Sequence, residues 1–122
     1  MSNRVLIVDD NATIRSLASK VVESLGLQPT VAKDGQQGYE LAAEQSFQLI
    51  LSDINMPKMD GIEMISKVRK LPSYARTPIL IITTESSDDM IQKGKQAGAN
   101  GWMTKPFQRE KLVDMLKRLS NS

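Results

Sequence analysis

The chain has 122 residues and contains neither cysteine nor histidine, which excludes disulfide scaffolds, thiol catalysis, histidine-bound zinc and hydrolases that need a histidine base. Its hydrophobic content of 40% is enough for one core, and its length fits one domain. The net charge of +2 with scattered lysines does not favour a nucleic-acid partner, and no apolar run could span a membrane. We therefore expect a single cytoplasmic domain over residues 1–122, with no output domain and no membrane partner.

The first half of the chain alternates apolar runs with amphipathic segments. Residues 5–8 form a continuous apolar run, typical of a strand buried on both faces of a parallel sheet. A helix should follow and end at Gly26, since glycine often terminates helices in the left-handed conformation. Residues 28–32, with Pro29 near the start, fit an edge strand, and residues 36–46 fit a second helix. The buried face of the first helix is expected to comprise Ile14, Leu17, Ala18, Val21, Val22 and Leu25.

The second half continues the alternation. Strands are predicted at residues 49–51, 79–82 and, more weakly, 101–104. Further helices are predicted at residues 61–71, 87–98 and 109–119. The pattern indicates an α/β fold, a doubly wound five-stranded parallel sheet with five helices.

The helix predicted over residues 87–98 has the weakest pattern. Ser86, Ser87 or Asp88 could cap it. Gly94 and a polar composition leave it little apolar area to bury. An element with so little buried area should be easy to shift.

Polar residues follow four of the predicted strands at the point where each strand ends. Asp9 and Asp10 follow the first strand, and Asp53 follows the third. Thr83 follows the fourth strand and Lys105 the fifth. Because ligands of such sheets bind at the carboxyl ends of the strands, we expect three carboxylates, one hydroxyl and one ammonium group to converge.

Each of these residues also has a local explanation. Asp10 or Asn11 could cap the first helix, and Asp53 could form a turn with Asn55 and Pro57. Thr83 could be an ordinary strand residue, and Lys105 could be a solvated surface lysine. None of these explanations accounts for the shared position of all five groups at one end of the fold.

The clustered carboxylates favour a bound cation. Neighbouring negative charges raise one another's pKa unless a cation lies among them. Oxygen ligands suit a hard cation, and Mg²⁺ needs only one or two carboxylates together with phosphate oxygens. A phosphoryl group on a carboxylate could share its oxygens among the metal, a lysine and a hydroxyl. The pattern therefore predicts Mg²⁺-assisted phosphoryl transfer to a carboxylate.

These motifs resemble those of the response-regulator receiver family over essentially the whole chain. The resemblance rests on Asp9-Asp10, on residues 53–61 (DINMPKMDG), on Thr83 and on Lys105-Pro106-Phe107. It implies a flavodoxin-like sheet with strand order 2-1-3-4-5. Within the family, the chain is most similar to the single-domain chemotaxis regulators.

The resemblance also assigns the metal ligands. Asp53 would accept the phosphoryl group and, with Asp10, would bind Mg²⁺ directly. The backbone carbonyl of Asn55 would complete the protein ligands, and Asp9 would act mainly through metal-bound water.

Three residues of the last two strands and the segment after them would carry the signal, according to the same resemblance. Thr83 and Lys105 would hold the phosphoryl oxygens, and Thr83 would form a conformational switch with Trp102. Members of the family commonly have tyrosine or phenylalanine at the position of Trp102, so this residue is a departure, and its alternative role is to cover the sheet edge. The bond at the position of Lys105-Pro106 is often cis in this family, and the isomer in this chain stays open.

The implied protein is a monomeric signalling protein rather than a turnover enzyme. Its partners would be a histidine kinase of the chemotaxis type, a downstream target such as the flagellar motor switch protein, and a phosphatase. It would assist its own phosphorylation and slow autodephosphorylation. A phosphate sink or a phosphorelay intermediate would use the same site.

Two unrelated functions are alternatives. A flavodoxin-like electron carrier would need a phosphate-binding loop and stacking aromatics, but two aspartates follow the first strand and only 4% of residues are aromatic. An aspartyl-nucleophile phosphatase would need a general acid and a cap over its substrate, and no insertion provides one.

A partner surface is expected on residues 87–98, the strand around Trp102 and the last helix. Four lysines would make this face basic and suited to an acidic partner, or would merely keep it soluble. They are Lys93, Lys95, Lys111 and Lys117.

Overall fold

The computed structural model describes residues 3–120, and its strands pair side by side in the order β2-β1-β3-β4-β5, all parallel. This arrangement confirms the predicted doubly wound sheet and its strand order. Residues 1–2 and 121–122 lie outside the described residues. The strands are β1 (Arg4–Val8), β2 (Gln28–Ala32), β3 (Leu49–Ser52), β4 (Ile79–Thr83) and β5 (Gly101–Thr104).

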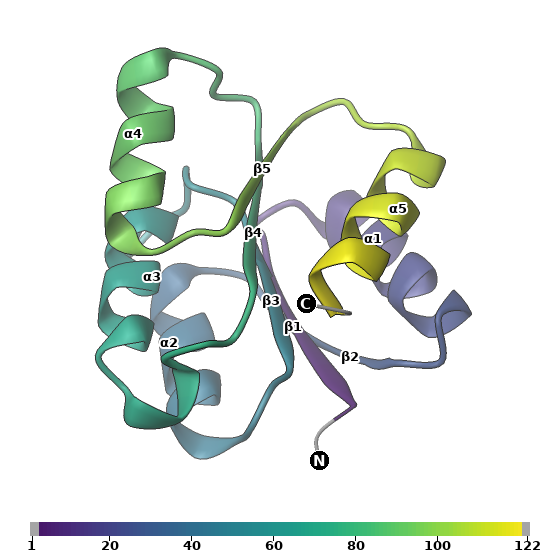
Figure 1. Cartoon of the computed structure of the whole chain (residues 1–122), viewed down its shortest axis with the longest axis horizontal. Helices are drawn as coiled ribbons and strands as arrows, with labels where there is room; N and C mark the ends of the chain where they lie inside the picture. Colours follow the sequence, from purple (N-terminus) through teal and green to yellow (C-terminus); the bar gives the residue numbers. More distant parts are fainter. Residues whose placement is uncertain (1–2, 121–122) are drawn as a thin grey trace.

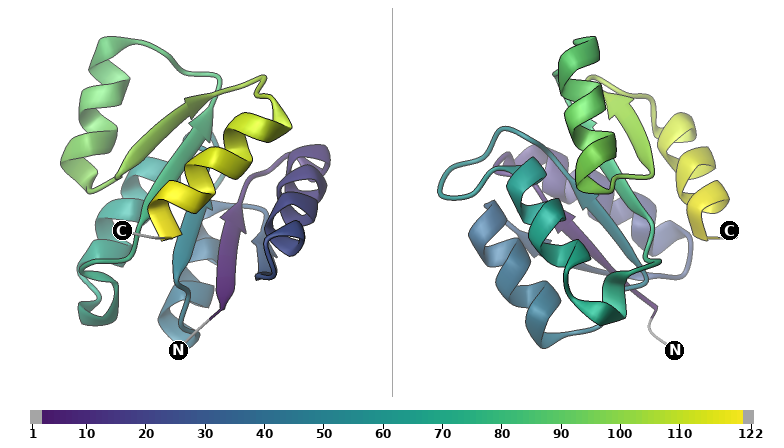
Figure 2. Two further views of the ribbon diagram at one scale, coloured as in Figure 1. Left: turned by 45° about the vertical axis from the view of Figure 1, so that its right-hand side comes forward. Right: turned by 60° about the vertical axis from the view of Figure 1, so that its left-hand side comes forward.

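The five α-helices form two layers, one on each face of the sheet (Figure 1). One layer comprises α2 (Gly35–Glu44), α3 (Gly61–Arg69) and α4 (Asp88–Ala97). The opposite layer comprises α1 (Ala12–Ser24) and α5 (Arg109–Ser120). Figure 2 shows that the loops at the carboxyl ends of the strands gather at one end of the sheet. None of the described helices is both long and apolar enough to cross a bilayer.

The central strands are buried on both faces, as their continuous apolar sequences predict. Leu6, Ile50 and Ile81 pack into the core on the side of α2 and α3. Ile7 and Leu51 point into the core on the side of α1 and α5. The edge strands β2 and β5 are partly exposed, which matches their weaker apolar patterns.

The structure corrects two predictions about the helices. Leu17 was expected on the buried face of α1, but it is 38% exposed because that helix buries a narrower stripe. The third helix was expected to reach residue 71, but α3 ends at Arg69. Pro72 forces an extended conformation on Leu71 and begins an unpredicted 3₁₀ helix, η1 (Pro72–Tyr74). The fourth helix has the expected serine cap, from Ser87.

Candidate functional site

Three carboxylates meet at the carboxyl end of the sheet. Asp9 and Asp10 follow β1, and Asp53 follows the neighbouring strand β3. One oxygen from each carboxylate lies within 4.8 Å of the other two. Asp9 and Asp53 are buried, whereas Asp10 is exposed, so one side of the cluster opens to solvent.

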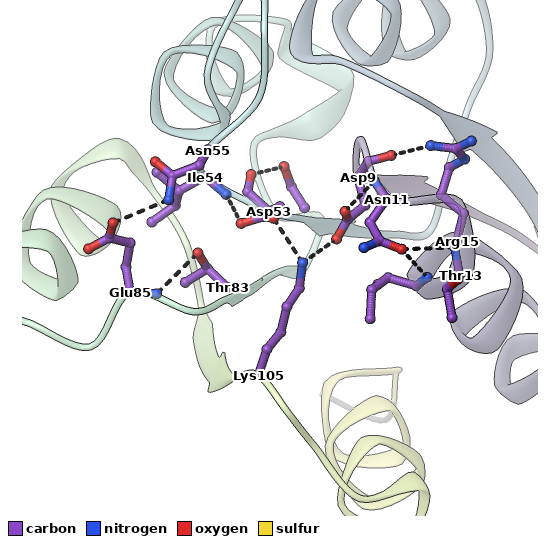
Figure 3. Close-up of polar contacts among 12 residues, drawn as sticks. Asp9, Asn11, Thr13, Arg15, Asp53, Ile54, Asn55, Thr83, Glu85 and Lys105 are labelled. Atoms are coloured by element: carbon purple, nitrogen blue, oxygen red, sulfur yellow. Dashed lines mark hydrogen bonds and ion pairs between the residues drawn. The ribbon is translucent and has the colours of Figure 1, made fainter.

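Lys105 holds two of these carboxylates together. Its Nζ donates hydrogen bonds to Oδ2 of Asp9 and to Oδ2 of Asp53, each 2.8 Å long (Figure 3). Burial alone would lower the pKa of Lys105, but the two carboxylates outweigh this effect and raise its pKa. Lys105 therefore carries its charge at neutral pH. The bond from Lys105 to Pro106, whose isomer the sequence left open, is cis.

Asp9 is fixed from several sides. Its Oδ1 accepts a 2.9 Å hydrogen bond from the backbone N–H of Asn11, and its carbonyl accepts a 2.7 Å bond from Nη1 of Arg15. Burial raises the pKa of Asp9, and the charge of Asp53 adds to this shift, while the bonds from Lys105 and Asn11 oppose it. Ionised Asp9 is therefore costly in the metal-free protein.

Asp10 could either cap α1 or belong to the carboxylate cluster, and the observed N-cap of α1 decides between these explanations. The side chain of Asn11 accepts hydrogen bonds from the backbone N–H groups of Thr13 and Ile14, at 2.9 and 3.1 Å. Asn11 is thus the N-cap of α1, and capping does not account for Asp10. The carboxylate of Asp10 lies instead beside those of Asp9 and Asp53.

The loop after β3 orients Asp53. Its Oδ1 accepts a 2.6 Å hydrogen bond from the backbone N–H of Ile54. A side chain at Gly61 would approach the carbonyl oxygen of Asp53 to 1.9 Å, so only glycine fits where α3 begins. The side chain of Asn55 turns away from the carboxylates and donates a 3.2 Å bond to Oε1 of Glu85 across the mouth of the site.

Thr83 and Trp102 are linked through the loop after β4. Thr83 is fully buried, and its hydroxyl accepts a 3.3 Å bond from the backbone N–H of Glu85. The indole N–H of Trp102 donates a 3.1 Å bond to the carbonyl of Glu85. The ring of Trp102 also covers Gly94 of α4, where a Cβ atom would lie 2.7 Å from it. Trp102 therefore touches both the loop and α4.

The sequence of residues 5–117 matches the family model of the response regulator receiver domain. The chain belongs to the response-regulator receiver family. This receiver domain is 43% identical over 110 residues to a probable chemotaxis protein CheY of Rhizobium etli, covering 89% of this chain and 85% of that protein. It is 36% identical over 119 residues to the transcriptional regulatory protein SrrA of Staphylococcus aureus, covering 98% of this chain and 48% of that protein. The chain thus spans about half the length of SrrA.

Solved structures share the fold over nearly the whole receiver domain. The chemotaxis response regulator CheY4 of Vibrio cholerae is 40% identical with a TM-score of 0.91, covering 98% of this chain and 99% of that chain. The receiver domain of a sensor histidine kinase from Pseudomonas aeruginosa, with a magnesium ion in its active site cleft, is 30% identical with a TM-score of 0.90 and full coverage of both chains.

The ligand atoms of this receiver domain fit Mg²⁺. The cluster of Asp9, Asp10 and Asp53 offers only carboxylate oxygens, which a hard cation prefers. The exposed side at Asp10 leaves room for water and phosphate oxygens, which Mg²⁺ commonly keeps among its ligands. The cluster is therefore a candidate magnesium site.

Two residues of this site were not identified from the sequence. Arg15 lies in the first turn of α1, where a cation opposes the helix dipole, and that unfavourable position was the available signal. Glu85 follows Thr83 by two residues, but its contacts with Asn55 and Trp102 depend on tertiary structure alone.

Proposed function

We propose that this receiver domain accepts a phosphoryl group on Asp53 from a histidine kinase, with Mg²⁺ bound, and then changes conformation and binds a downstream protein. The flagellar motor switch is the proposed target, since the relative that is 43% identical is a probable chemotaxis protein. The observation that carries the proposal is the contact of Lys105 with both Asp9 and Asp53, beside the exposed Asp10.

The proposed reaction transfers a phosphoryl group between two nucleophiles. A carboxylate oxygen of Asp53 attacks the phosphorus of a phosphohistidine, and the P–N bond breaks with its electron pair going to the imidazole nitrogen. The Ile54 N–H holds the carboxylate in a fixed orientation, which favours in-line attack. Lys105 then offers its charge to the phosphoryl oxygens. Mg²⁺ held by Asp9, Asp10 and Asp53 would supply the remaining neutralisation of negative charge.

The proposed switch follows from the position of Thr83. Its hydroxyl lies at the end of β4, beside β3, and bonds only to Glu85 among the described residues. A phosphoryl oxygen on Asp53 would compete for this hydroxyl. If Thr83 turns toward the phosphoryl group, the loop around Glu85 loses a contact and Trp102 changes its environment.

The partner surface is proposed on α4, β5 and α5. A groove of about 640 Å³ formed by β5, the next loop and α5 is lined by apolar Trp102, Phe107 and Met115. Lys111 and Arg118 stand at the same groove together with one acidic residue, Asp114, so the groove keeps a net positive charge. Such a groove suits an amphipathic segment that carries acidic residues.

The proposal also concerns the oligomeric state of the protein, its location and its dephosphorylation. We propose a monomeric, cytoplasmic receiver domain whose phosphoryl group is removed by slow autodephosphorylation and by a phosphatase. Use as a phosphate sink or as a relay intermediate is the second candidate, because both roles need only the carboxylate site.

A pull-down with purified motor switch protein tests the proposed target. Beryllofluoride with Mg²⁺ mimics the phosphoryl group, and the mimic should increase binding at least about tenfold, a coupling of about 1.4 kcal/mol. The Asp53→Asn variant should show no increase. Equal binding with and without the mimic would contradict the proposed target, and loss of phosphate from the kinase without target binding would favour the phosphate sink.

A further inference from the structure

Arg69, the last residue of α3, holds the C-terminal end of α4. Its Nε and Nη2 donate hydrogen bonds to the carbonyl of Gly98, at 3.1 and 2.8 Å. Nη2 also donates a 2.7 Å bond to Oδ1 of Asn100, and Nη1 donates a 2.6 Å bond to the carbonyl of Tyr74. One guanidinium group therefore joins α3, η1, the end of α4 and the segment that leads into β5.

The groups that receive these bonds are themselves fixed. Gly98 has a left-handed φ of 118°, and a Cβ atom there would lie 2.7 Å from Cγ of Arg69, so the two residues pack closely. Oδ1 of Asn100 also accepts a 2.8 Å bond from the backbone N–H of Ile79, and the backbone N–H of Asn100 donates to the carbonyl of Ile79 at 2.8 Å. The C-terminal end of α4 is thus tied to the start of β4.

The N-terminal end of α4 has different connections. The side chain of Ser87 caps its own helix by accepting from the N–H of Met90, and it ties α4 to no other element. The preceding loop is held through Glu85, whose three bonds run to Thr83, Asn55 and Trp102. The N-terminal end of α4 is therefore connected to Thr83 and Trp102, the candidate switch residues, whereas the C-terminal end is connected to Arg69.

We propose that Arg69 is a positioning residue that anchors the C-terminal end of α4, so that a change at Thr83 swings the N-terminal end about that anchor. This inference rests on the proposed function and adds how the signal moves the output helix. Residues near the start of α4, such as Ile91, would change position with phosphorylation, whereas Lys95 would stay in place.

Spin labels can measure this motion, because the chain has no cysteine and labels would attach only to the two that are introduced. One label at exposed Glu23 of α1 is paired either with a label at Asp88 or with a label at Gln96, which are exposed and lie in the first and last turns of α4. Beryllofluoride with Mg²⁺ should shift the Glu23–Asp88 distance and leave the Glu23–Gln96 distance unchanged. In the Arg69→Gln variant the Gln96 label should move as well.

Hydrogen exchange without the mimic tests the anchor separately. Arg69→Gln should speed exchange of the Gly98 and Ala99 amides on the order of tenfold or more, as expected from the loss of bonds made by a charged donor. Lys70→Gln is the matched control, since it removes one exposed positive charge next to Arg69, and it should leave exchange unchanged. If Arg69→Gln does not fold, Arg69→Lys, which keeps the charge without the planar fork, should show a smaller increase.

The outcomes separate the two proposals. Unchanged amide exchange in both Arg69 variants overturns the anchor, whether or not the protein is phosphorylated. Equal shifts of both labels in the unsubstituted protein overturn the pivot while leaving phosphorylation intact. If fluorine NMR detects no bound beryllofluoride, the proposed function fails and the pivot fails with it, even where the exchange result supports the anchor.

Discussion

The indole N–H of Trp102 donates a 3.1 Å hydrogen bond to the backbone carbonyl of Glu85, two residues after Thr83. The backbone N–H of the same Glu85 donates to the hydroxyl of Thr83. One residue thus connects the buried hydroxyl at the end of β4 with the aromatic ring on β5. In this arrangement the ring of Trp102 can cover the edge of the sheet and also respond to a change at Thr83.

Trp102 fluorescence should change when the phosphoryl group is mimicked. Beryllofluoride with Mg²⁺ should alter the emission intensity or the access of a quencher, because the proposed motion of Thr83 disturbs the Glu85 loop to which the indole is bound. Trp102 is the only tryptophan, so the signal is unambiguous. The Asp53→Asn variant serves as the control. An unchanged spectrum with the mimic demonstrably bound would mean that the signal leaves by another face.

Removing the charge of Glu85 should speed phosphorylation by a small acyl-phosphate. Glu85 lies at the mouth of the site, bonded to Asn55, where its carboxylate repels an approaching anion. Glu85→Gln should raise the labelling rate by up to about fivefold, the factor that corresponds to about 1 kcal/mol for unit charges 4 Å apart in water. Glu110→Gln on α5 is the control for a general change of charge. Equal rates in both variants would count against this role.

Asp9→Asn should stabilise the metal-free protein at neutral pH. Burial raises the pKa of Asp9 above its ordinary 3.8, so the native state binds more protons than the unfolded state between these two values. The stability that Asp9 contributes is therefore fully present below pH 3.8 and is lost as the pH rises through the raised pKa. Asparagine does not ionise, so the variant avoids this loss of stability. The midpoint of thermal unfolding at pH 7 should rise by about 4 °C for each kcal/mol of unfolding free energy recovered.

Bound Mg²⁺ should offset the stability that the unsubstituted protein loses when Asp9 ionises. A ligand that binds only the folded state raises the unfolding midpoint by mass action, so melts with millimolar Mg²⁺ should shift upward. The shift should be smaller in Asp9→Asn, which has one carboxylate fewer. A midpoint that does not respond to Mg²⁺ in the unsubstituted protein would contradict the metal site.

Thr83→Ala and Lys105→Ala should weaken the fluorescence response to different degrees. Thr83 contributes one neutral hydroxyl, so its loss should permit labelling and weaken the fluorescence response. Lys105 contributes the positive charge that bridges Asp9 and Asp53, so its loss should remove more of the response. Lys20→Ala, an exposed lysine on α1, is the control. Full responses in both site variants would refute the switch.

The fold was predictable because its signals are local. The apolar run at residues 79–82 and the aspartates that follow residues 5–8 and 49–51 fix the buried strands and the end at which polar groups gather. Leu17 was placed wrongly because helical periodicity does not show where the sheet beneath a helix ends. Pro72 was visible in the sequence, yet the shortened α3 and η1 were not predicted.

The contacts at the two ends of α4 were not predictable. Arg69 and Gly98 are 29 residues apart, and Asn55 and Glu85 are 30 apart, so no periodicity or spacing relates them. Nor does the sequence show that the hydroxyl of Thr83 bonds to Glu85 in this state. These contacts depend on how two loops and two helix ends meet in space.

Chemical labelling tests directly whether Asp53 is the phosphorylation site. Incubation with a small acyl-phosphate and Mg²⁺, without any kinase, should add one phosphate to the protein, because Lys105 and the metal neutralise the incoming group. Intact-mass spectrometry detects the addition, and peptide mapping locates it. We expect a phosphorylated Asp53 and no addition to the Asp53→Asn variant under the same conditions. Labelling of that variant to the same extent, or a phosphate mapped to another residue, would contradict this assignment.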